Sequence, residues 1–372
     1  MPLSKIQFGN TGSSHKNIII NGGMQVAQRS TSAVTSVNQE YKTVDRVKAA
    51  FITTGTVQTQ QVSDVPAGEG FSHSMKTTVT GADTSVAAGD FIDLYQQRIE
   101  ARNISTLMYA TSGAKTTTLS FYVKSNVTGV YNGTITNQND SVKLPFSFSI
   151  SSANTWERII IDNIPPITTG SDSGTAWETS TYTNMGAAVR IYGMLGSTYY
   201  GATNKVWNTA GAANSYGHQA QVNFLSSTSN NFFITGMQWE EGSAATEFEH
   251  RLFAEELRLC MRYYEKSYNY GVVPGSAGTS ADVNYQGAIF FTTAHNNHYE
   301  QIQYKERKRT APTLTLYNTH TGATGQNYSH HDNNSTAQSD TWANGENGVR
   351  VAFAGTGDGE RTEFHYTAES EL

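Results

Sequence analysis

Acidic side chains are the first candidates for catalysis, because cleavage of a glycosidic bond needs two carboxyl groups flanking that bond. Glu240 and Glu241 are adjacent in the sequence, so a strand would place them on opposite faces, where they cannot flank one bond. The other acids considered lie in polar segments with no spacing that marks two of them as partners: Asp332, Asp340, Glu346, Asp358 and Glu360. The sequence has no G-x-S-x-G, H-E-x-x-H or phosphate-loop motif. We therefore predict that the protein is not an enzyme, with a polysaccharide depolymerase as the less favoured alternative.

Histidine and cysteine side chains would support metal binding or nucleophilic attack. His295 and His298, or the pair His330 and His331, could supply metal ligands where subunits meet on a threefold axis, but neither spacing is diagnostic. Cys260 is the only cysteine, which excludes an intrachain disulfide and a thiolate zinc cluster within one chain. No cationic residue is placed locally to activate it. We predict a buried, unreactive thiol and no metal site.

Aromatic side chains offer binding chemistry in place of catalysis. Residues 193–220 form a long segment of low hydrophobicity, and rings in such a loop could stack on the apolar face of a sugar. The candidate glycan contacts are Tyr199, Tyr200, Trp207 and Tyr216. The alternative is that these rings only hold the loop against the rest of the domain or against a neighbouring subunit.

The composition is typical of an all-β protein. Only 15% of the 372 residues are charged and the net charge is −6, which leaves no electrostatic basis for binding nucleic acid or an anionic membrane. The 33 Gly and 20 Tyr, with only seven Pro, are typical of short strands joined by tight turns. The first residues contain no signal-peptide core, and no apolar run approaches the roughly 20 residues of a membrane span. We expect a protein made in the cytoplasm, without a membrane span.

We divide the chain into four segments. Residues 1–16 are polar and predict an extended arm, 17–250 a jelly-roll β-sandwich, 251–266 a connecting helix, and 267–372 a smaller C-terminal β domain. A first strand is expected within 17–29. The clearer strand signals of the sandwich are 72–80, 91–100, 117–124, 129–135, 144–150, 156–161, 188–192 and 231–239. Those of the C-terminal domain are 287–293, 301–305, 313–317, 349–353 and 363–368, with a polar stretch at 318–347.

The helix prediction depends on apolar residues at helical spacing. Phe253, Leu257, Cys260, Met261 and Tyr264 are separated by 4, 3, 1 and 3 positions, which puts them on one face. The residues expected to point to water are Glu255, Arg258, Arg262 and Glu265. A helix of about four turns is marginal alone and needs a surface to dock on. The side chains expected to anchor it are Trp239, Phe248, Phe253, Leu257 and Tyr264.

Three strings, in order along the chain, carry a resemblance to a known group of proteins. They are Asn21–Ser32 (NGGMQVAQRSTS), Gln238–Arg251 (QWEEGSAATEFEHR) and Glu255–Glu265 (EELRLCMRYYE). Two segments of the C-terminal β domain, Lys308–Asn318 and Phe364–Leu372, carry the same resemblance. The sequence thus resembles tail-fibre and related structural proteins of tailed bacteriophages.

This resemblance implies a jelly roll similar to that of carbohydrate-binding modules, then a helix and a small β domain, assembled on a virion and often as a trimer. It implies a fibre or adhesin that attaches to other virion proteins through its N-terminal arm and contacts host-surface glycans. The alternative is an architectural part, such as a capsid decoration, head fibre or neck/tail connector, with no host ligand. Jelly rolls of this kind often hold a structural calcium ion where Asn21, Glu240 and Glu241 would sit. Their oxygen atoms suit calcium, but no loop has a recognisable ligand period. We predict no other cofactor.

Overall fold

The computed structural model describes residues 16–168, 177, 184–209, 211–278, 286–289, 297–329, 334–354 and 361–372. Residues 1–15 of the expected arm lie outside the described residues. So do the candidates His295, His330, His331, Asp332, Asp358 and Glu360, and the side chains of His298 and Asp340.

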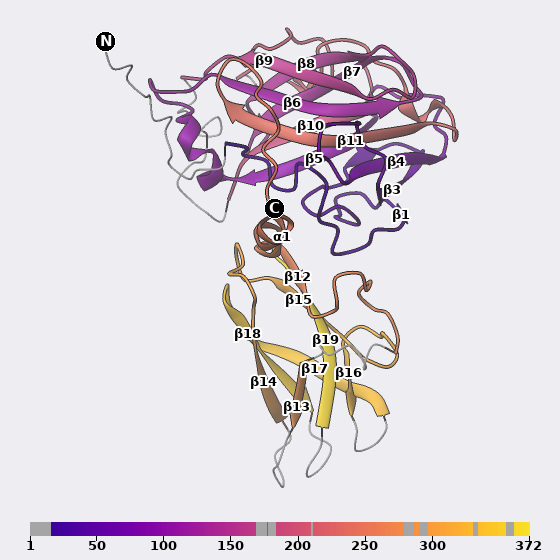
Figure 1. Cartoon of the computed structure of the whole chain (residues 1–372), viewed down its shortest axis with the longest axis vertical. Helices are drawn as coiled ribbons and strands as arrows, with labels where there is room; N and C mark the ends of the chain where they lie inside the picture. The colour runs from indigo at the N-terminus through magenta and orange to yellow at the C-terminus, as the bar shows by residue number, and fades with distance from the viewer. Residues whose placement is uncertain are drawn as a thin grey trace, which may run out of the picture.

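Two antiparallel sheets form the N-terminal domain, one in front of the other in Figure 1. Their strand orders are β1-β3-β4-β11-β6-β9 and β2-β5-β10-β7-β8. The strands are β1 Val34–Thr35, β2 Phe51–Ile52, β3 Thr56–Val62, β4 Ser74–Gly81, β5 Phe91–Glu100, β6 Thr117–Ser125, β7 Gly129–Asn137, β8 Lys143–Ile150, β9 Glu157–Ile164, β10 Met185–Leu195 and β11 Asn231–Glu241. Short 3-10 turns cover Ala101–Leu107, Ala213–Ser215 and Phe224–Ser226. The predicted all-β sandwich is confirmed, and its eight clear strand signals correspond to β4 to β11.

Side-chain alternation decides which face of each strand enters the core. In β6, Leu119, Phe121 and Val123 are fully buried between the sheets. In β10, Val189 and Ile191 enter the same core. The residues between and after them therefore point away from the core, toward the outer face of the five-stranded sheet.

The strand predicted within 17–29 is wrong, because this segment is a turn-rich strap packed beside β11. Ile18 N donates to the Trp239 carbonyl (2.9 Å), and Met237 N donates to the Gly22 carbonyl (3.0 Å). A Cβ atom on Gly22 would lie 2.1 Å from the Met237 carbonyl oxygen, so this approach needs a glycine. We call residues 17–29 the strap.

The helix is shorter than predicted. α1 spans Phe253–Met261, and the next residues form a strand, β12 (Tyr264–Lys266), that pairs with the last strand of the chain. The predicted apolar face is wrong at its first position, since Phe253 is 44% exposed, and the buried residues of α1 are Glu256 and Cys260. The expectation that Glu265 faces water is also wrong, because β12 buries it completely.

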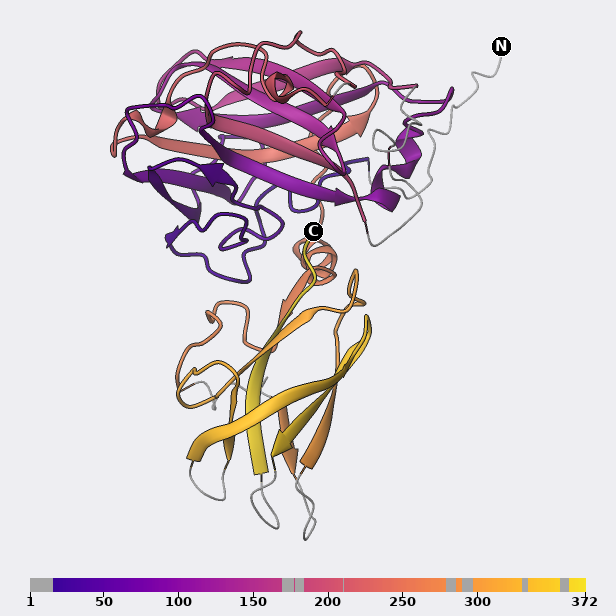
Figure 2. The ribbon, with the colours of Figure 1, turned by 180° about the vertical axis from the view of Figure 1, so that it is seen from behind.

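A third sheet forms the C-terminal domain, with the order β12-β19-β16-β17-β18-β14 and with β13 and β15 pairing β19. Its strands are β12, β13 Gln286–Ile289, β14 Asn297–Gln303, β15 Thr313–Tyr317, β16 Gln326–Ser329, β17 Asn334–Asn344, β18 Gly348–Ala354 and β19 Arg361–Glu369. β16 and β17 lie within the polar stretch 318–347, where the sequence analysis predicted no strand. Figures 1 and 2 show the two domains end to end, with α1 and the C-terminus between them. In the part of the chain described, no helix is long and apolar enough to cross a membrane.

Candidate functional site

A pocket lies on the outer face of the five-stranded sheet, on the side of β10 that carries Arg190 and Tyr192. Its volume is about 220 Å³. Drug-sized ligands occupy pockets of roughly 300 to 1,000 Å³, so this one suits a smaller group. The lining residues are Gln39, Phe91, Gln96, Arg98, Asp140, Arg190, Tyr192, Leu195, Tyr199 and Tyr216. We call it the sheet pocket.

Three aromatic rings form one wall of the sheet pocket. The Tyr199 ring meets those of Phe91 and Tyr216 edge to face, each at a centroid distance of 5.7 Å. The Arg190 guanidinium lies 5.5 Å from the Phe91 centroid and 5.4 Å from that of Tyr216. Edge-to-face pairs and cation–π contacts favour one arrangement of the rings, so the wall is formed without a ligand.

The loop that carries Tyr199 and Tyr216 is fastened to β7. The fully buried Asn132 side chain accepts from the His218 backbone N–H (2.9 Å) and donates to the Gln219 carbonyl (2.8 Å). The Thr134 hydroxyl donates to the Tyr216 carbonyl. These bonds satisfy the backbone of a long loop and hold its rings over the sheet.

A buried ion pair forms the floor of the sheet pocket. Arg190 donates from Nε and Nη2 to the two carboxylate oxygens of Asp93, at 3.0 and 3.2 Å. Burial raises the pKa of Asp93 to about 6, although the Arg190 charge acts in the opposite direction. Asp140 lies 3.9 Å from Arg190 Nη1 at the pocket edge. The charge of Arg190 is therefore balanced from within the protein.

Two other lining groups have unused hydrogen-bonding capacity. Among the described residues, neither Arg98 Nε nor Gln96 Oε1 has a hydrogen-bond partner, although both atoms are buried. Burial, and then the charges of Arg98 and Arg190, lower the pKa of the nearby Lys48 to about 8. A buried donor and a buried acceptor left unpaired are costly unless a ligand or water completes them.

The structure separates the four predicted glycan contacts into two groups. Tyr199 and Tyr216 line the sheet pocket together. Tyr200 does not line it, and its backbone bridges to Gly217 within the loop. Glycan contact by any of these residues stays a prediction.

Trp207 lies away from the sheet pocket and holds its loop in place. Its ring packs edge to face against Tyr109 at 5.9 Å and Trp177 at 5.4 Å. Its Nε1 donates to the Pro165 carbonyl (2.7 Å). This is the loop-anchoring arrangement that the sequence left open as the alternative.

Sequence reasoning missed the strand residues of the sheet pocket. Gln96 and Arg98 on β5, and Arg190 and Tyr192 on β10, lie two positions apart on their strands. The signal was the polar half of the alternation in 91–100 and 188–192. That pattern is equally typical of an ordinary solvated sheet face, so it could not single out a site.

The three calcium candidates do not form one site. The Asn21 amide bonds to the backbone of Val26 and Asp45. Glu240 is buried and accepts from Gln238, and from the backbone and hydroxyl of Thr246. Glu241 is exposed and pairs with Lys115 at 3.1 Å, so it faces away from Glu240 as the strand alternation predicted. Within the described residues, no group of three or more His, Cys, Asp or Glu side chains is placed to hold a metal ion.

The remaining candidates for reactive side chains, Glu346 and Cys260, are paired or buried. Glu346 pairs with Arg307 at the surface of the C-terminal domain, with Arg307 Nε 2.7 Å from the carboxylate. Cys260 is completely buried, and burial, with Asp45 and Glu256 nearby, raises the pKa of its thiol well above the ordinary value. A thiol with a raised pKa is a poor nucleophile at neutral pH.

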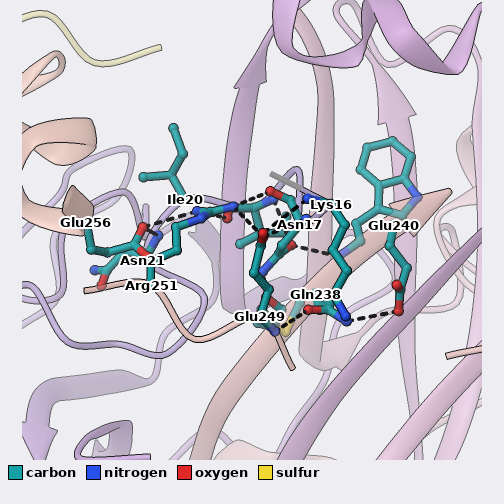
Figure 3. Close-up of polar contacts among 12 residues, drawn as sticks. Lys16, Asn17, Ile20, Asn21, Gln238, Glu240, Glu249, Arg251 and Glu256 are labelled. Atoms are coloured by element: carbon teal, nitrogen blue, oxygen red, sulfur yellow. Dashed lines mark hydrogen bonds and ion pairs between the residues drawn. The ribbon is translucent and has the colours of Figure 1, made fainter. Parts of the chain in front are cut away.

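A second buried polar cluster joins the strap to α1, and Figure 3 shows it. Arg251 Nη1 donates to the Ile19 carbonyl (3.1 Å) and lies 3.4 Å from Glu256, while Nη2 donates to the Asn17 carbonyl and lies 3.1 Å from Glu249. The Asn17 backbone N–H donates to Glu249 (2.9 Å), and the Asn21 N–H donates to Glu256. We call Asn17, Asn21, Glu249, Arg251 and Glu256 the junction network. It brings together the three strings that carry the sequence resemblance.

The C-terminus returns to the same region. Glu371 pairs with the fully buried Arg46, and the Tyr41 hydroxyl donates to the Leu372 carbonyl (3.0 Å). Just after α1, Arg262 donates to both carboxylate oxygens of Glu100 at the end of β5 (2.7 and 2.9 Å). Ion pairs and hydrogen bonds therefore connect the two domains on both sides of α1.

The predicted anchors of α1 have different roles. Trp239 is fully buried inside the sandwich, where its Nε1 donates to Thr117 (3.0 Å), so it does not seat the helix. Phe248 packs on Phe71, and Phe253 packs on Tyr270. Leu257 borders the small cluster under α1, and Tyr264 lies below the Arg29 guanidinium at 3.8 Å. The side chains that seat α1 are Ile20, Val26, Cys260 and Tyr263.

No known family model matches the sequence, and no curated protein matches it. Among solved structures, it is similar to the enzymatically active domain of tailspike protein 4 of bacteriophage CBA120, with 13% identity and a TM-score of 0.29. That alignment covers 61% of this chain and 22% of the tailspike chain. It is also similar to the family 11 carbohydrate-binding module of a cellulosomal cellulase of Clostridium thermocellum (12% identity, TM-score 0.27, 60% of this chain and 99% of the module). A third is the C-terminal family 22 module of Clostridium thermocellum Xyn10B (11% identity, TM-score 0.28, 59% and 99%). All three TM-scores are below 0.5, so the sandwich assignment depends on the strand order of the chain itself.

Proposed function

We propose that this chain is a structural protein of a tailed-phage virion, a tail fibre or adhesin that contacts host-surface glycans through the sheet pocket. The observation that carries glycan contact is the preformed wall of Phe91, Tyr199 and Tyr216 beside Gln96 and Arg98. Rings can stack on the apolar face of a sugar, and the polar groups can bond its hydroxyls. The virion role is supported by the three resembling strings and the two resembling C-terminal segments, Lys308–Asn318 and Phe364–Leu372.

The proposal includes a homotrimer that attaches to other virion proteins through residues 1–16. Each copy would bind weakly, and the repetition of copies on a particle would supply avidity. The protein would act without catalysis. Asp140 is the one carboxylate that lines the sheet pocket among the described residues, and Arg190 holds the carboxylate of Asp93 below it. A glycosidase needs two free carboxyl groups flanking the bond.

The test is binding of the purified chain to an array of host-surface glycans, compared for Tyr199→Ala, Tyr216→Ala and Tyr200→Ala. We expect the first two variants to lose binding and Tyr200→Ala to keep it, because Tyr200 does not line the sheet pocket. Equal loss in all three would assign the effect to a disturbed loop. If the unmodified chain binds no glycan, the proposed adhesin function is wrong.

The second candidate is an architectural virion component with no host ligand. The junction network and the Arg46–Glu371 pair support it, because they hold the two domains together with buried ionic contacts, as a part that transmits force would need. Binding to capsid or tail proteins without binding to any glycan would favour this candidate. Release of reducing ends from host polysaccharide would instead indicate a depolymerase.

A further inference from the structure

The two arginines that line the sheet pocket differ in how they are paired. Asp93 binds both Nε and Nη2 of Arg190. Asp140 lies beside Arg190 and the Tyr216 hydroxyl. The Arg98 side chain also lines the pocket, and in the described part of the chain it forms no ion pair and no hydrogen bond. One guanidinium is therefore available to a ligand.

The second open group lies two residues away on the same strand. Gln96 is only 4% exposed, lines the same pocket, and has no partner for Oε1 among the described residues. On one strand, positions 96 and 98 point to the same face. A ligand that fills this corner should therefore offer an anion to Arg98 and an O–H or N–H donor to Gln96.

We propose that the sheet pocket recognises an acidic sugar, whose carboxylate pairs with Arg98 and whose hydroxyl donates to Gln96 while the ring rests on the aromatic wall. This inference rests on the glycan-binding function proposed above. A planar guanidinium matches a planar carboxylate through two parallel hydrogen bonds, which a neutral sugar cannot form.

The experiment uses an array of bacterial-surface oligosaccharides that contain uronic or nonulosonic acids, each beside its carboxyl-reduced counterpart. We expect the acidic members to bind about 10- to 100-fold more tightly than the reduced ones, the range for a charge-assisted hydrogen bond. Arg98→Gln should abolish this preference, Arg98→Lys should keep part of it, and the exposed Arg350→Gln in β18 should leave it unchanged. Thermal unfolding of each variant checks that it is folded.

The outcomes separate this inference from the function on which it rests. Equal binding of acidic and reduced glycans would overturn the acidic-sugar assignment and leave glycan binding intact. Binding confined to sulfated or phosphorylated sugars would overturn the proposal that a carboxylate is the group recognised. No binding to any member of the array would overturn both.

Discussion

The junction network and the sheet pocket are both buried polar clusters of the same chain, but they differ in how their groups are paired. In the junction network, both Nη atoms of Arg251 bind backbone carbonyls and carboxylates, and only its Nε has no partner among the described residues. In the sheet pocket, Arg98 forms no pair there and Gln96 keeps an open acceptor. Satisfied groups stabilise a fold, whereas unsatisfied groups cost stability and are available to a ligand. This difference supports a structural role for the junction network and the proposed binding role for the sheet pocket.

The largest effect should come from breaking the junction network. Arg251→Met removes the cation between Glu249 and Glu256 and leaves Glu256, whose side chain is 6% exposed, without its opposite charge. Removal of one partner of a buried pair typically costs about 3 to 5 kcal/mol. Urea unfolding should show this loss. Arg158→Met, which removes a surface arginine that bonds the Thr246 carbonyl, is the control and should cost far less. A loss of less than about 1 kcal/mol for Arg251→Met, the size expected of an exposed pair, would contradict the structural role of the network.

The ion pair below the sheet pocket should appear in the pH dependence of stability. Burial raises the pKa of Asp93 from 3.8 to about 6, so the folded chain holds this proton more tightly than the unfolded chain. The contribution of Asp93 is therefore most favourable below about pH 4 and falls as pH rises to about 6. One unit of pKa is worth about 1.4 kcal/mol, which gives a fall of about 2 to 3 kcal/mol.

The measurement is the free energy of unfolding from pH 4 to 7 for the unmodified chain and for Asp93→Asn. The amide of this variant does not titrate, so the difference between the two curves isolates the Asp93 carboxyl from all others. A constant difference across the acid half of this range would show that Arg190 keeps the pKa of Asp93 near its ordinary value.

The close backbone contact between the strap and β11 at Gly22 can be tested by adding a side chain there. Gly22→Ala would place a Cβ atom 2.1 Å from the Met237 carbonyl oxygen, and this backbone can yield only if the strap moves away from β11. Overpacking of this kind costs about 1 to 3 kcal/mol. Gly89→Ala is the matched control, because a Cβ at that position meets no atom within 4 Å. Equal thermal stability of the two variants would mean that the strap adapts and does not define the joint.

The sequence predicted the sandwich well because its strands have strong local signals. Leu119, Phe121 and Val123 alternate with polar residues, and such alternation needs no knowledge of distant segments. The strap was predicted wrongly as a strand because its isoleucines are buried by tertiary contacts, with Asn17 and Asn21 side chains replacing a strand partner. Glu265 was expected on the surface, because only the fold brings Lys308 to it. Glu256 was left unassigned, although its partner Arg251 lies only five positions before it.

The candidate site shows the same division between local and distant information. Tyr199 and Tyr216 could be predicted because aromatic residues are conspicuous in a polar loop. Gln96 and Arg98 could not, because a polar residue at every second position of a strand is what any solvated face contains. Their importance depends on Tyr199 and Tyr216 lining the same pocket from the loop after β10, which no spacing in the sequence encodes.

The smallest effect on stability should come from the residues proposed to bind ligand. Arg98→Gln removes a charge that has no partner in the described residues, so the free energy of unfolding should change by less than about 0.5 kcal/mol or even rise. The comparison is with Arg190→Gln, which leaves the buried Asp93 unpaired and should be clearly destabilised at neutral pH. Two arginines lining one pocket would then have opposite roles, one structural and one for binding. Equal destabilisation by both substitutions would show that Arg98 supports the fold, and the distinction between the junction network and the sheet pocket would be lost.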